Sequence, residues 1–398
     1  MRMLNRRYFL RGTALAMMGV GAAPQWLARA AAGARKKVLV TIFQRGAMDG
    51  LSAVVPHGEK EYYALRPGLA IAAKDCVDLD GFFGFHPSLA PLADAFRAKQ
   101  LAVIEAVGSP DPTRSHFDAQ DYMESGTPGR KATADGWLNR ALEPGSQASP
   151  VRAVSLGPNL PRALRGSNAA AAVNSLREFR VEDPMGASAF QSLYAHAGGG
   201  ELQATGKETF EAIRMVQSVQ RQPYTPSGGA VYPNGRLGQS LLQIARLIKA
   251  GIGLEVAFAD VGGWDTHVNQ ANTLTNLLGE FARSIEAFRR DMGDGMEDVL
   301  LMTMSEFGRT ARENGNRGTD HGHANIMLAL GAGVRGGKVH GKWPGLAREQ
   351  LYEGRDLALT TDFRDVLGEA VSAHLGNRRL EAVFPGYTPK PPGILDRS

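Results

Sequence analysis

Short apolar runs rich in β-branched residues alternate with stretches of helical spacing through most of this chain of 398 residues. Strands are expected at 38–43, 101–107, 151–156, 254–259 and 299–304, with further apolar elements at 326–330 and 365–375. Helices are expected at 87–99, from Ser115 onward, and at 208–220, 238–250 and 274–292. This alternation predicts an α/β fold in which helices cover both faces of a mostly parallel sheet. In such folds the site lies beyond the carboxyl ends of the strands, so the polar clusters that follow the strands are the candidates.

Residues 1–30 differ from the rest of the chain in charge. They hold five arginines and no acidic residue, and because the whole chain has a net charge of +5, the remainder is balanced. Because the chain after residue 30 has no net charge, its overall charge gives no electrostatic reason to bind nucleic acid. Arg6-Arg7, the apolar stretch 12–27 and the small-x-small pattern at 28–30 resemble a twin-arginine export signal. We expect the twin-arginine translocase to export the folded protein to the periplasm, with cleavage near Ala30 and no stable membrane span afterwards. A basic amphipathic helix or a retained anchor is the alternative.

Composition narrows the class of protein. Apolar residues make up 43% and charged residues 21%, which is ordinary for globular chains and excludes wholesale disorder. No run of about 20 apolar residues interrupts the body of the chain, which excludes a polytopic membrane protein. Cys76 is the only cysteine, which excludes a disulfide framework and a thiolate metal cage. We expect a single α/β domain over 36–395, with 157–235 as a less regular insertion or cap.

A carboxylate and an imidazole follow the strand expected at 254–259. Asp265 and His267 are two residues apart, so in extended backbone both side chains point to one side. Such a pair either ligates Zn²⁺ or a similar ion, or acts as an acid–base pair. The structural alternative is a loop in which Asp265 caps the next helix and His267 lies on the surface.

A second polar segment, 318–325, places one carboxylate and two imidazoles within four residues: Asp320, His321 and His323. Two imidazoles and a carboxylate form a common ligand set of hydrolytic metal sites. A solvated loop, or a helix that begins with Asp320 as its cap, is the alternative.

Two other strand ends carry candidates. Glu306 follows the strand at 299–304 as a ligand or base, and Arg309 is suited to hold a phosphate or sulfate group. The structural alternative is that these two side chains pair with each other. Arg45 and Asp49 lie in the loop after the strand at 38–43. Asp49 is either a metal ligand or part of a turn that Asp-Gly favours by itself.

Ser115 opens a predicted helix, and Asp118 lies three residues further on, a spacing that also fits a capping box. The dipole of a helix N-terminus favours an alkoxide or an anionic ester. Ser115 is therefore a candidate nucleophile, with His116 beside it as a ligand, a base or a substrate-binding residue. The chain has no Gly-x-Ser-x-Gly elbow, no Walker loop and no Gly-x-Gly-x-x-Gly segment opening a helix. Nucleotide-binding functions are therefore disfavoured.

Several long segments follow one another in a fixed order along the chain: RGAMDGL, FHPSLAPL, SHFDAQDYMESG, GGWDTHVNQ, MSEFGRTARENG, GTDHGHAN, GKWPGL and TTDFRDVLGE. In this order they resemble the bacterial domain-of-unknown-function 1501 family, from about Val38 to the C-terminus. That family is grouped with the alkaline phosphatase and sulfatase superfamily. The resemblance implies a three-layer α/β/α sandwich with metals at the carboxyl edge of the sheet.

The resemblance also implies roles for particular residues. The segment 320–324 resembles a metal-binding segment of alkaline phosphatases, and Asp49 matches their first aspartate ligand. Asp265 and His267 resemble the ligand pair of the other metal, and Ser115 falls where the nucleophile sits. In alkaline phosphatases the Asp-His segment follows its strand directly, whereas here Asp320 comes about fourteen residues after the strand end. The Cys-x-Pro-x-Arg motif of sulfatases is absent, which excludes formylglycine chemistry.

These observations favour an exported hydrolase that depends on one or two divalent metals, Zn, Mn, Ca or Fe, and cleaves a phosphate or sulfate ester. The expected substrate is an anionic small-molecule or polymer ester. The predicted metal ligands are Asp49, Asp265, His267, Asp320, His321 and His323. The predicted catalytic residues are Ser115 and Glu306, and those that bind the anion are Arg45, Arg309 and His116. A non-catalytic exported binding protein with the same fold is one alternative, and a metal-free Ser–His–Asp hydrolase is another.

Overall fold

The computed structural model describes residues 37–131, 133–143, 149–174 and 201–396. The predicted export signal at 1–30 and part of the predicted insertion lie outside the described residues.

Within the described ranges, the central sheet contains nine strands: β1 Val38–Gln44, β5 Leu101–Gly108, β6 Ala153–Leu156, β7 Ala171–Val173, β8 Val256–Val261, β9 Val299–Met304, β10 Asn325–Gly331, β11 Val339–His340 and β12 Thr361–Asp362. Their order across the sheet is β11-β5-β10-β9-β1-β8-β6-β7, and β12 pairs with β5. A small antiparallel sheet joins β2 Val54–Val55, β4 Gly84–Phe85 and β3 Val77–Asp78.

The central sheet is mostly parallel. β1 pairs in parallel with β8 on one side and β9 on the other, so that Leu39 lies opposite both Val256 and Leu300. Of the central-sheet strands in the described part of the chain, β10 alone runs against its neighbours, pairing antiparallel with β9 and with β5. The start of β10 therefore lies at the same edge of the sheet as the carboxyl ends of the other strands.

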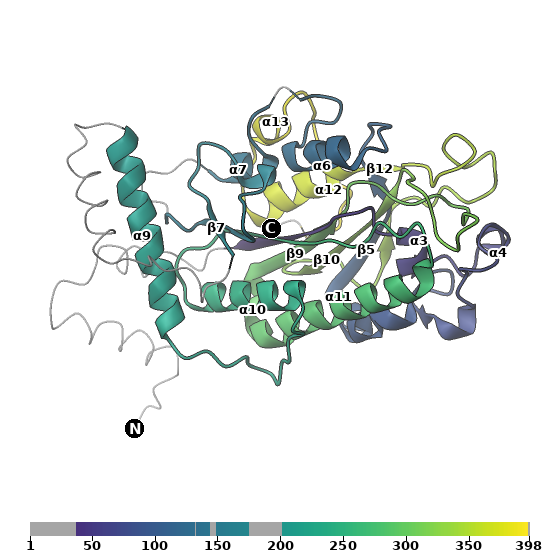
Figure 1. The fold of residues 1–398 in the computed structure, drawn as a ribbon, viewed down its shortest axis with the longest axis horizontal. Coiled ribbons are helices and arrows are strands. Elements are labelled where there is room, and N and C mark those ends of the chain that lie inside the picture. Colours follow the sequence, from purple (N-terminus) through teal and green to yellow (C-terminus); the bar gives the residue numbers. More distant parts are fainter. Residues whose placement is uncertain (1–36, 132, 144–148, 175–200, 397–398) are drawn as a thin grey trace.

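Helices cover both faces of this sheet (Figure 1). The α-helices are α3 Gly50–Ala53, α4 Lys60–Leu65, α5 Ala93–Arg97, α6 His116–Ser125, α7 Trp137–Ala141, α9 Glu201–Arg221, α10 Arg236–Lys249, α11 Gln270–Met292, α12 Phe363–Glu369 and α13 Leu380–Val383. Short 3₁₀ helices are η2 Ala73–Asp75, η3 Pro87–Leu92, η4 Arg162–Leu164 and η5 Gly293–Asp298, and a π-helical turn, η6 Ala370–His374, extends α12.

Alternation along the strands divides the hydrophobic core in two. In β1, Val40 and Ile42 pack into the core beneath α10 and α11, whereas Leu39 and Phe43 pack into the core on the opposite face. That second core contains side chains of α7, α12 and α13. Successive strand residues point to opposite faces, so a buried strand has to be apolar on both. The predicted α/β/α sandwich with a mostly parallel sheet is thereby confirmed.

Two predicted elements differ from the structure. The helix expected at 87–99 is a 3₁₀ helix, η3, followed by the short α5, because Pro91 lies inside this stretch and has no N–H to donate. The segment 171–173, predicted as part of an irregular insertion, forms strand β7 and pairs in parallel with β6. This piece of the predicted insertion therefore belongs to the central sheet.

Candidate metal centre

Loops from five strands meet at one edge of the sheet. Strands β1, β5, β8 and β9 end at this edge, and β10 begins there because it runs in the opposite direction. The loops contribute, in chain order, Gly46, His116, Asp265, His267, Glu306 and His321. The antiparallel course of β10 explains why Asp320 and His321 reach this edge although they lie so far beyond the end of β9.

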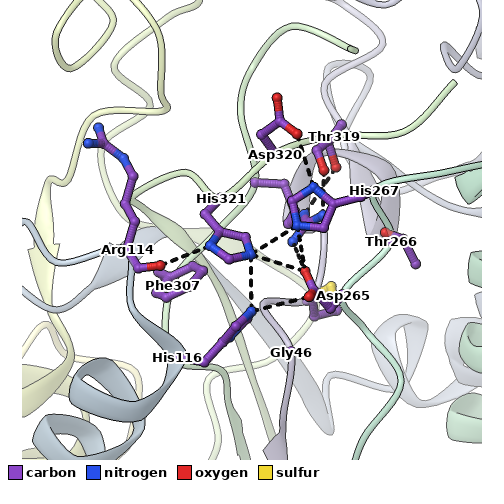
Figure 2. Close-up of polar contacts among 12 residues, drawn as sticks. Gly46, Arg114, His116, Asp265, Thr266, His267, Phe307, Thr319, Asp320 and His321 are labelled. Atoms are coloured by element: carbon purple, nitrogen blue, oxygen red, sulfur yellow. Dashed lines mark hydrogen bonds and ion pairs between the residues drawn. The ribbon is translucent and has the colours of Figure 1, made fainter. Parts of the chain in front are cut away.

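Three imidazoles and one carboxylate converge here, as Figure 2 shows. Nε2 of His321 lies 3.1 Å from Nε2 of His116 and 3.0 Å from Nε2 of His267. Oδ1 of Asp265 lies 3.1 Å from Nε2 of His321 and 3.0 Å from Nε2 of His267, and its Oδ2 lies 3.5 Å from Nε2 of His116. We call these four residues the central cluster. Two nitrogen ligands of one tetrahedral zinc ion are roughly 3.3 Å apart, so the spacing fits a shared ion.

Each imidazole of the central cluster is fixed at Nδ1 by an oxygen that serves as a hydrogen-bond acceptor. The pairs are His116 with Oε1 of Glu306 at 2.8 Å, His267 with Oδ1 of Asp320 at 2.9 Å, and His321 with the main-chain oxygen of Arg114 at 2.8 Å. Ionised carboxylates and carbonyl groups only accept hydrogen bonds, so the proton of each neutral ring is on Nδ1. Acceptors of this kind stand behind most metal-bound histidines.

This proton arrangement leaves a bare Nε2 lone pair on every neutral ring of the central cluster. The three lone pairs face one another and the carboxylate of Asp265 at about hydrogen-bond distance. Lone pairs and a carboxylate repel one another at this range unless a positive charge stands among them. A metal ion or additional protons on the rings are the two ways to supply that charge.

Neighbouring groups shift the pKa values of the cluster residues in different directions. The hydrogen bond to Glu306 raises the pKa of His116, whereas burial lowers the pKa of His321. Desolvation pushes the pKa of Asp265 upward, but the hydrogen bond and charge of Arg309 outweigh it and lower that pKa. Asp265 is therefore ionised at neutral pH and offers an anionic oxygen to a cation.

Glu306 and Arg309 do not pair with each other, and each supports the central cluster from behind. Oε1 of the buried Glu306 accepts hydrogen bonds from the main-chain N–H of Gly46 and from the amide of Gln120, each at 2.8 Å. Glu306 thus holds the ring of His116 from behind, and its predicted catalytic role stays a prediction. The buried Arg309 donates to Oδ1 of Asp265 at 2.7 Å. It holds that carboxylate and is not free to hold a substrate anion.

The two predicted site residues in the loop after β1, Arg45 and Asp49, also form ion pairs with other side chains. The guanidinium of Arg45 is 2.8 Å from Asp260 and 2.8 Å from Glu124. The structure does not bring Asp49 into the central cluster, because Arg66 donates to both of its carboxylate oxygens, at 2.7 and 3.0 Å. Both side chains of this ion pair are buried, so Asp49 has a structural partner where a metal was expected.

The remaining predicted residues lie around the central cluster. Asp320 stands behind His267 as its Nδ1 acceptor. His323 points elsewhere, and its ring stacks on Tyr352 with 4.3 Å between the ring centroids. Ser115 is the N-cap residue of α6, directly before His116, and its side chain makes no capping hydrogen bond.

Sequence reasoning missed several of the supporting residues. Gln120 lies four residues after His116, and this spacing puts both side chains on one face of α6, so the signal was present. Asn314, which donates to Asp320 at 3.1 Å, and Arg66 carry no such signal. Their contacts depend on loops that the fold brings together.

Fold and cluster together define an α/β protein with a candidate histidine–aspartate metal centre at the carboxyl edge of its sheet. The model of the family described as "Protein of unknown function (DUF1501)" matches residues 82–377, and the chain belongs to this family. The matched range includes the whole central cluster but neither β1 nor Asp49.

The chain is also similar to solved structures. One is the C-terminal periplasmic domain of EcEptC from Escherichia coli in complex with Zn, with 9% identity, a TM-score of 0.33, and coverage of 75% of this chain and 74% of that chain. A second is an alkaline phosphatase superfamily protein from Vibrio parahaemolyticus, with 11% identity, a TM-score of 0.33, and coverage of 83% and 70%. A third is a mutant of TAB5 alkaline phosphatase with bound Mg, with 12% identity, a TM-score of 0.33, and coverage of 75% and 93%. No curated protein matches the chain.

None of the helices in the described ranges combines the length and the apolar character needed to cross a membrane.

Proposed function

We propose that this chain is an exported, metal-dependent hydrolase of a phosphate or sulfate ester. The central cluster carries the proposal, because three Nε2 atoms and the Asp265 carboxylate face one point while every Nδ1 is held by an acceptor. The choice of ester rests on the likeness of the segment 320–324 to a metal-binding segment of alkaline phosphatases.

The donor set limits the metal. Three imidazole nitrogens and one carboxylate oxygen suit Zn²⁺, and also Fe or Mn, at the distances observed. Ca²⁺ fits poorly because it takes six to eight oxygen ligands. The residues that would hold a divalent ion are His116, Asp265, His267 and His321, and when bound there it would supply Lewis-acid chemistry toward the ester.

Ser115 is our candidate nucleophile. It precedes His116 at the N-terminus of α6, where the helix dipole favours a negative charge, and its hydroxyl is not used for capping. In the proposed reaction Oγ bonds to phosphorus or sulfur, the ester bond breaks, and the departing alcohol leaves with the proton of Oγ. Water then cleaves the seryl ester and restores the hydroxyl. Glu306 and Asp320 keep two rings of the central cluster in place during both steps.

The experiment that tests the metal centre is elemental analysis of the protein purified without chelators, compared with the His321→Ala variant. We expect about one equivalent of metal in the wild type and almost none in the variant. His340→Ala is the matched control, because its Nε2 pairs with the main-chain oxygen of Arg335 and not with a residue of the central cluster, so this variant should keep the metal. A wild type that stays metal-free after dialysis against Zn²⁺, Mn²⁺ and Fe²⁺ would contradict the proposal.

The same preparations separate an enzyme from a binding protein. Turnover of p-nitrophenyl phosphate, bis(p-nitrophenyl) phosphate or p-nitrophenyl sulfate that disappears in both His321→Ala and Ser115→Ala supports the hydrolase. Metal binding without turnover of any ester supports the non-catalytic alternative. Turnover that survives Ser115→Ala assigns the nucleophile to water.

Export is tested at the paired arginines. Because Arg6-Arg7 resembles the recognition pair of the twin-arginine signal, replacing both by lysine is expected to keep the protein in the cytoplasm. Cell fractionation followed by mass spectrometry should find the wild type in the periplasm with a mature chain starting near Ala31. Equal distribution of wild type and variant would reject the pathway.

A further inference from the structure

The third imidazole of the central cluster has no carboxylate behind it. Carboxylates fix the rings of His116 and His267 directly, whereas the acceptor at Nδ1 of His321 is the main-chain oxygen of Arg114, at 2.8 Å. Figure 2 shows the side chain of Arg114 leading away from the central cluster. The orientation of the His321 ring therefore depends on what holds Arg114 in place.

Two carboxylates hold the guanidinium of Arg114. Oδ2 of Asp356 accepts hydrogen bonds from Nε, at 3.2 Å, and from Nη2, at 2.7 Å, while Oε2 of Glu353 accepts from Nη2 at 2.6 Å. The side chain of Asp356 is fully buried, whereas that of Glu353 is 53% exposed. Because water competes with an exposed ion pair and leaves it little net strength, the buried carboxylate is the partner that fixes Arg114.

Asp356 also reaches His321 through a second arginine. Nη2 of Arg355 donates to the main-chain oxygen of His321 at 2.8 Å, and Nε of Arg355 lies 3.7 Å from Oδ1 of Asp356. The two oxygens of one buried carboxylate thus face two arginines, one of which contacts the ring of His321 and the other its main chain. The carboxylate itself stands on a fixed turn, because the main chains of Asp356 and Tyr352 exchange two hydrogen bonds, at 2.8 and 3.0 Å.

We propose that Asp356 is a positioning residue for His321 and acts through Arg114 and Arg355. It does indirectly for this ring what carboxylates do directly for the other two rings of the central cluster. The inference rests on the proposed function, because it takes the central cluster as the metal centre. It gives Asp356 no contact with substrate or metal, so its whole effect passes through His321.

The first measurement is the Zn²⁺ affinity of the full-length chain, by competition with a chelating dye. We expect Asp356→Asn to weaken it by about tenfold, at the lower end of the roughly 10–100-fold loss that follows when a partner behind a metal-bound histidine is removed. Glu353→Gln is the matched control, because it takes the exposed carboxylate from the same guanidinium. It should change the affinity by about twofold or less. Equal losses in both variants would show an effect of charge alone and overturn the inference.

Two further variants separate position from charge and from stability. Arg114→Met with Asp356→Leu removes both charges, so no buried charge is left uncompensated and the fold is expected to survive. The Zn²⁺ affinity of this double variant should fall as far as that of Asp356→Asn. Asp291→Asn removes an equally buried carboxylate that pairs with Lys249, about 30 Å along α11 from the end that follows His267. It should lower the Tm but keep the affinity.

The second measurement reports on the ring itself. In the zinc-saturated chain the proton of His321 is on Nδ1, where the oxygen of Arg114 accepts its hydrogen bond and protects it from exchange with water. NMR of the chain with ¹⁵N-labelled histidine measures this exchange. In Asp356→Asn and in the double variant we expect the Nδ1 proton of His321 to exchange at least about tenfold faster. The Nδ1 proton of His267, which Asp320 holds directly, should keep its rate.

The outcomes separate the inference from the proposed function. Weaker Zn²⁺ binding together with faster exchange at His321 alone supports the inference, even if no ester is cleaved and the proposed function fails. Unchanged affinity in the double variant, or unchanged exchange at His321, overturns the inference even if esters are hydrolysed. Equal acceleration at His267 would show general loosening of the site and overturns it too. A wild type that binds no Zn²⁺ overturns both.

Discussion

Two carboxylates behind the imidazoles determine how firmly the central cluster is held. Glu306 and Asp320 fix the rings of His116 and His267 through their Nδ1 atoms. We expect Glu306→Gln and Asp320→Asn each to weaken metal binding by about 10–100-fold, because a neutral amide orients the ring less firmly and makes Nε2 a poorer donor. Competition with a chelating dye measures the affinity.

Asp118→Asn is the matched control for these two variants. It also removes a carboxylate, two residues after His116 in α6, but the partner of Asp118 is the exposed Lys131, beyond the end of α6. If this variant weakens metal binding as much as Asp320→Asn does, general charge and not contact with the ring is responsible.

The buried pair Asp49–Arg66 tests whether Asp49 is a structural residue or a ligand. Asp49→Asn leaves a fully buried guanidinium without its anion, so we expect a loss of about 3–5 kcal/mol in the free energy of unfolding. The metal content should stay unchanged. Urea unfolding and elemental analysis on the same preparation check both, and loss of metal with full stability would restore the ligand role.

The pH dependence of this pair has a definite sign. Desolvation acts to raise the pKa of Asp49, but Arg66 outweighs it, so the pKa in the folded state is lowered. Unfolded aspartate titrates at about pH 3.9, so the stabilisation is complete above that pH and is lost as the pH falls through the folded pKa. The difference between wild type and Asp49→Asn should therefore be constant from about pH 5 to 7 and shrink below about pH 4.

The residue types in the sequence indicated most members of the central cluster, but not which of the predicted ligands have other partners. Asp265, His267 and His321 were predicted as ligands, and the structure brings them together with His116. Asp49 was grouped with them because it follows a strand, yet its partner Arg66 lies 17 residues further on in no shared pattern. A buried ion pair between distant residues leaves no local signature, so it is visible only after folding.

At the level of elements, main-chain hydrogen bonds join the two arms of the loop between β9 and β10. This pairing brings His321 to the central cluster. The N–H of Gly308 donates to the oxygen of His323, and the N–H of Gly322 donates to the oxygen of Gly308, each at 2.8 Å. The strand before this loop was predicted from its apolar run, and the segment 326–330 after it was predicted only as an apolar element. The direction of β10 was not predicted, because a buried strand is apolar on both faces whichever way it runs.

The pairing of the two arms of the loop leaves no room for a side chain at Gly322. A Cβ at this position would lie 2.4 Å from main-chain atoms of Arg309, so the two arms of the loop would have to separate. We expect Gly322→Ala to lower the free energy of unfolding by about 1–3 kcal/mol and to weaken metal binding with it. Gly315→Ala, in the same loop but with open space around the added carbon, should be neutral or slightly stabilising. Similar losses in both variants, by denaturant titration, would show that the pairing does not matter.

For the whole molecule, the proposed ligands of the central cluster come from positions 116, 265, 267 and 321, so the unfolded chain has no preformed site. A metal that binds only the folded state stabilises it by about 4 kcal/mol at 1,000 times its Kd. For a chain of this size, that free energy corresponds to a rise in Tm of about 5 °C. We therefore expect chelation to lower the Tm of the wild type by this amount in a calorimetric scan. His321→Ala should start near the lower Tm and show no further change with chelator. If the chelator shifts both proteins alike, the stabilising ion binds outside the central cluster.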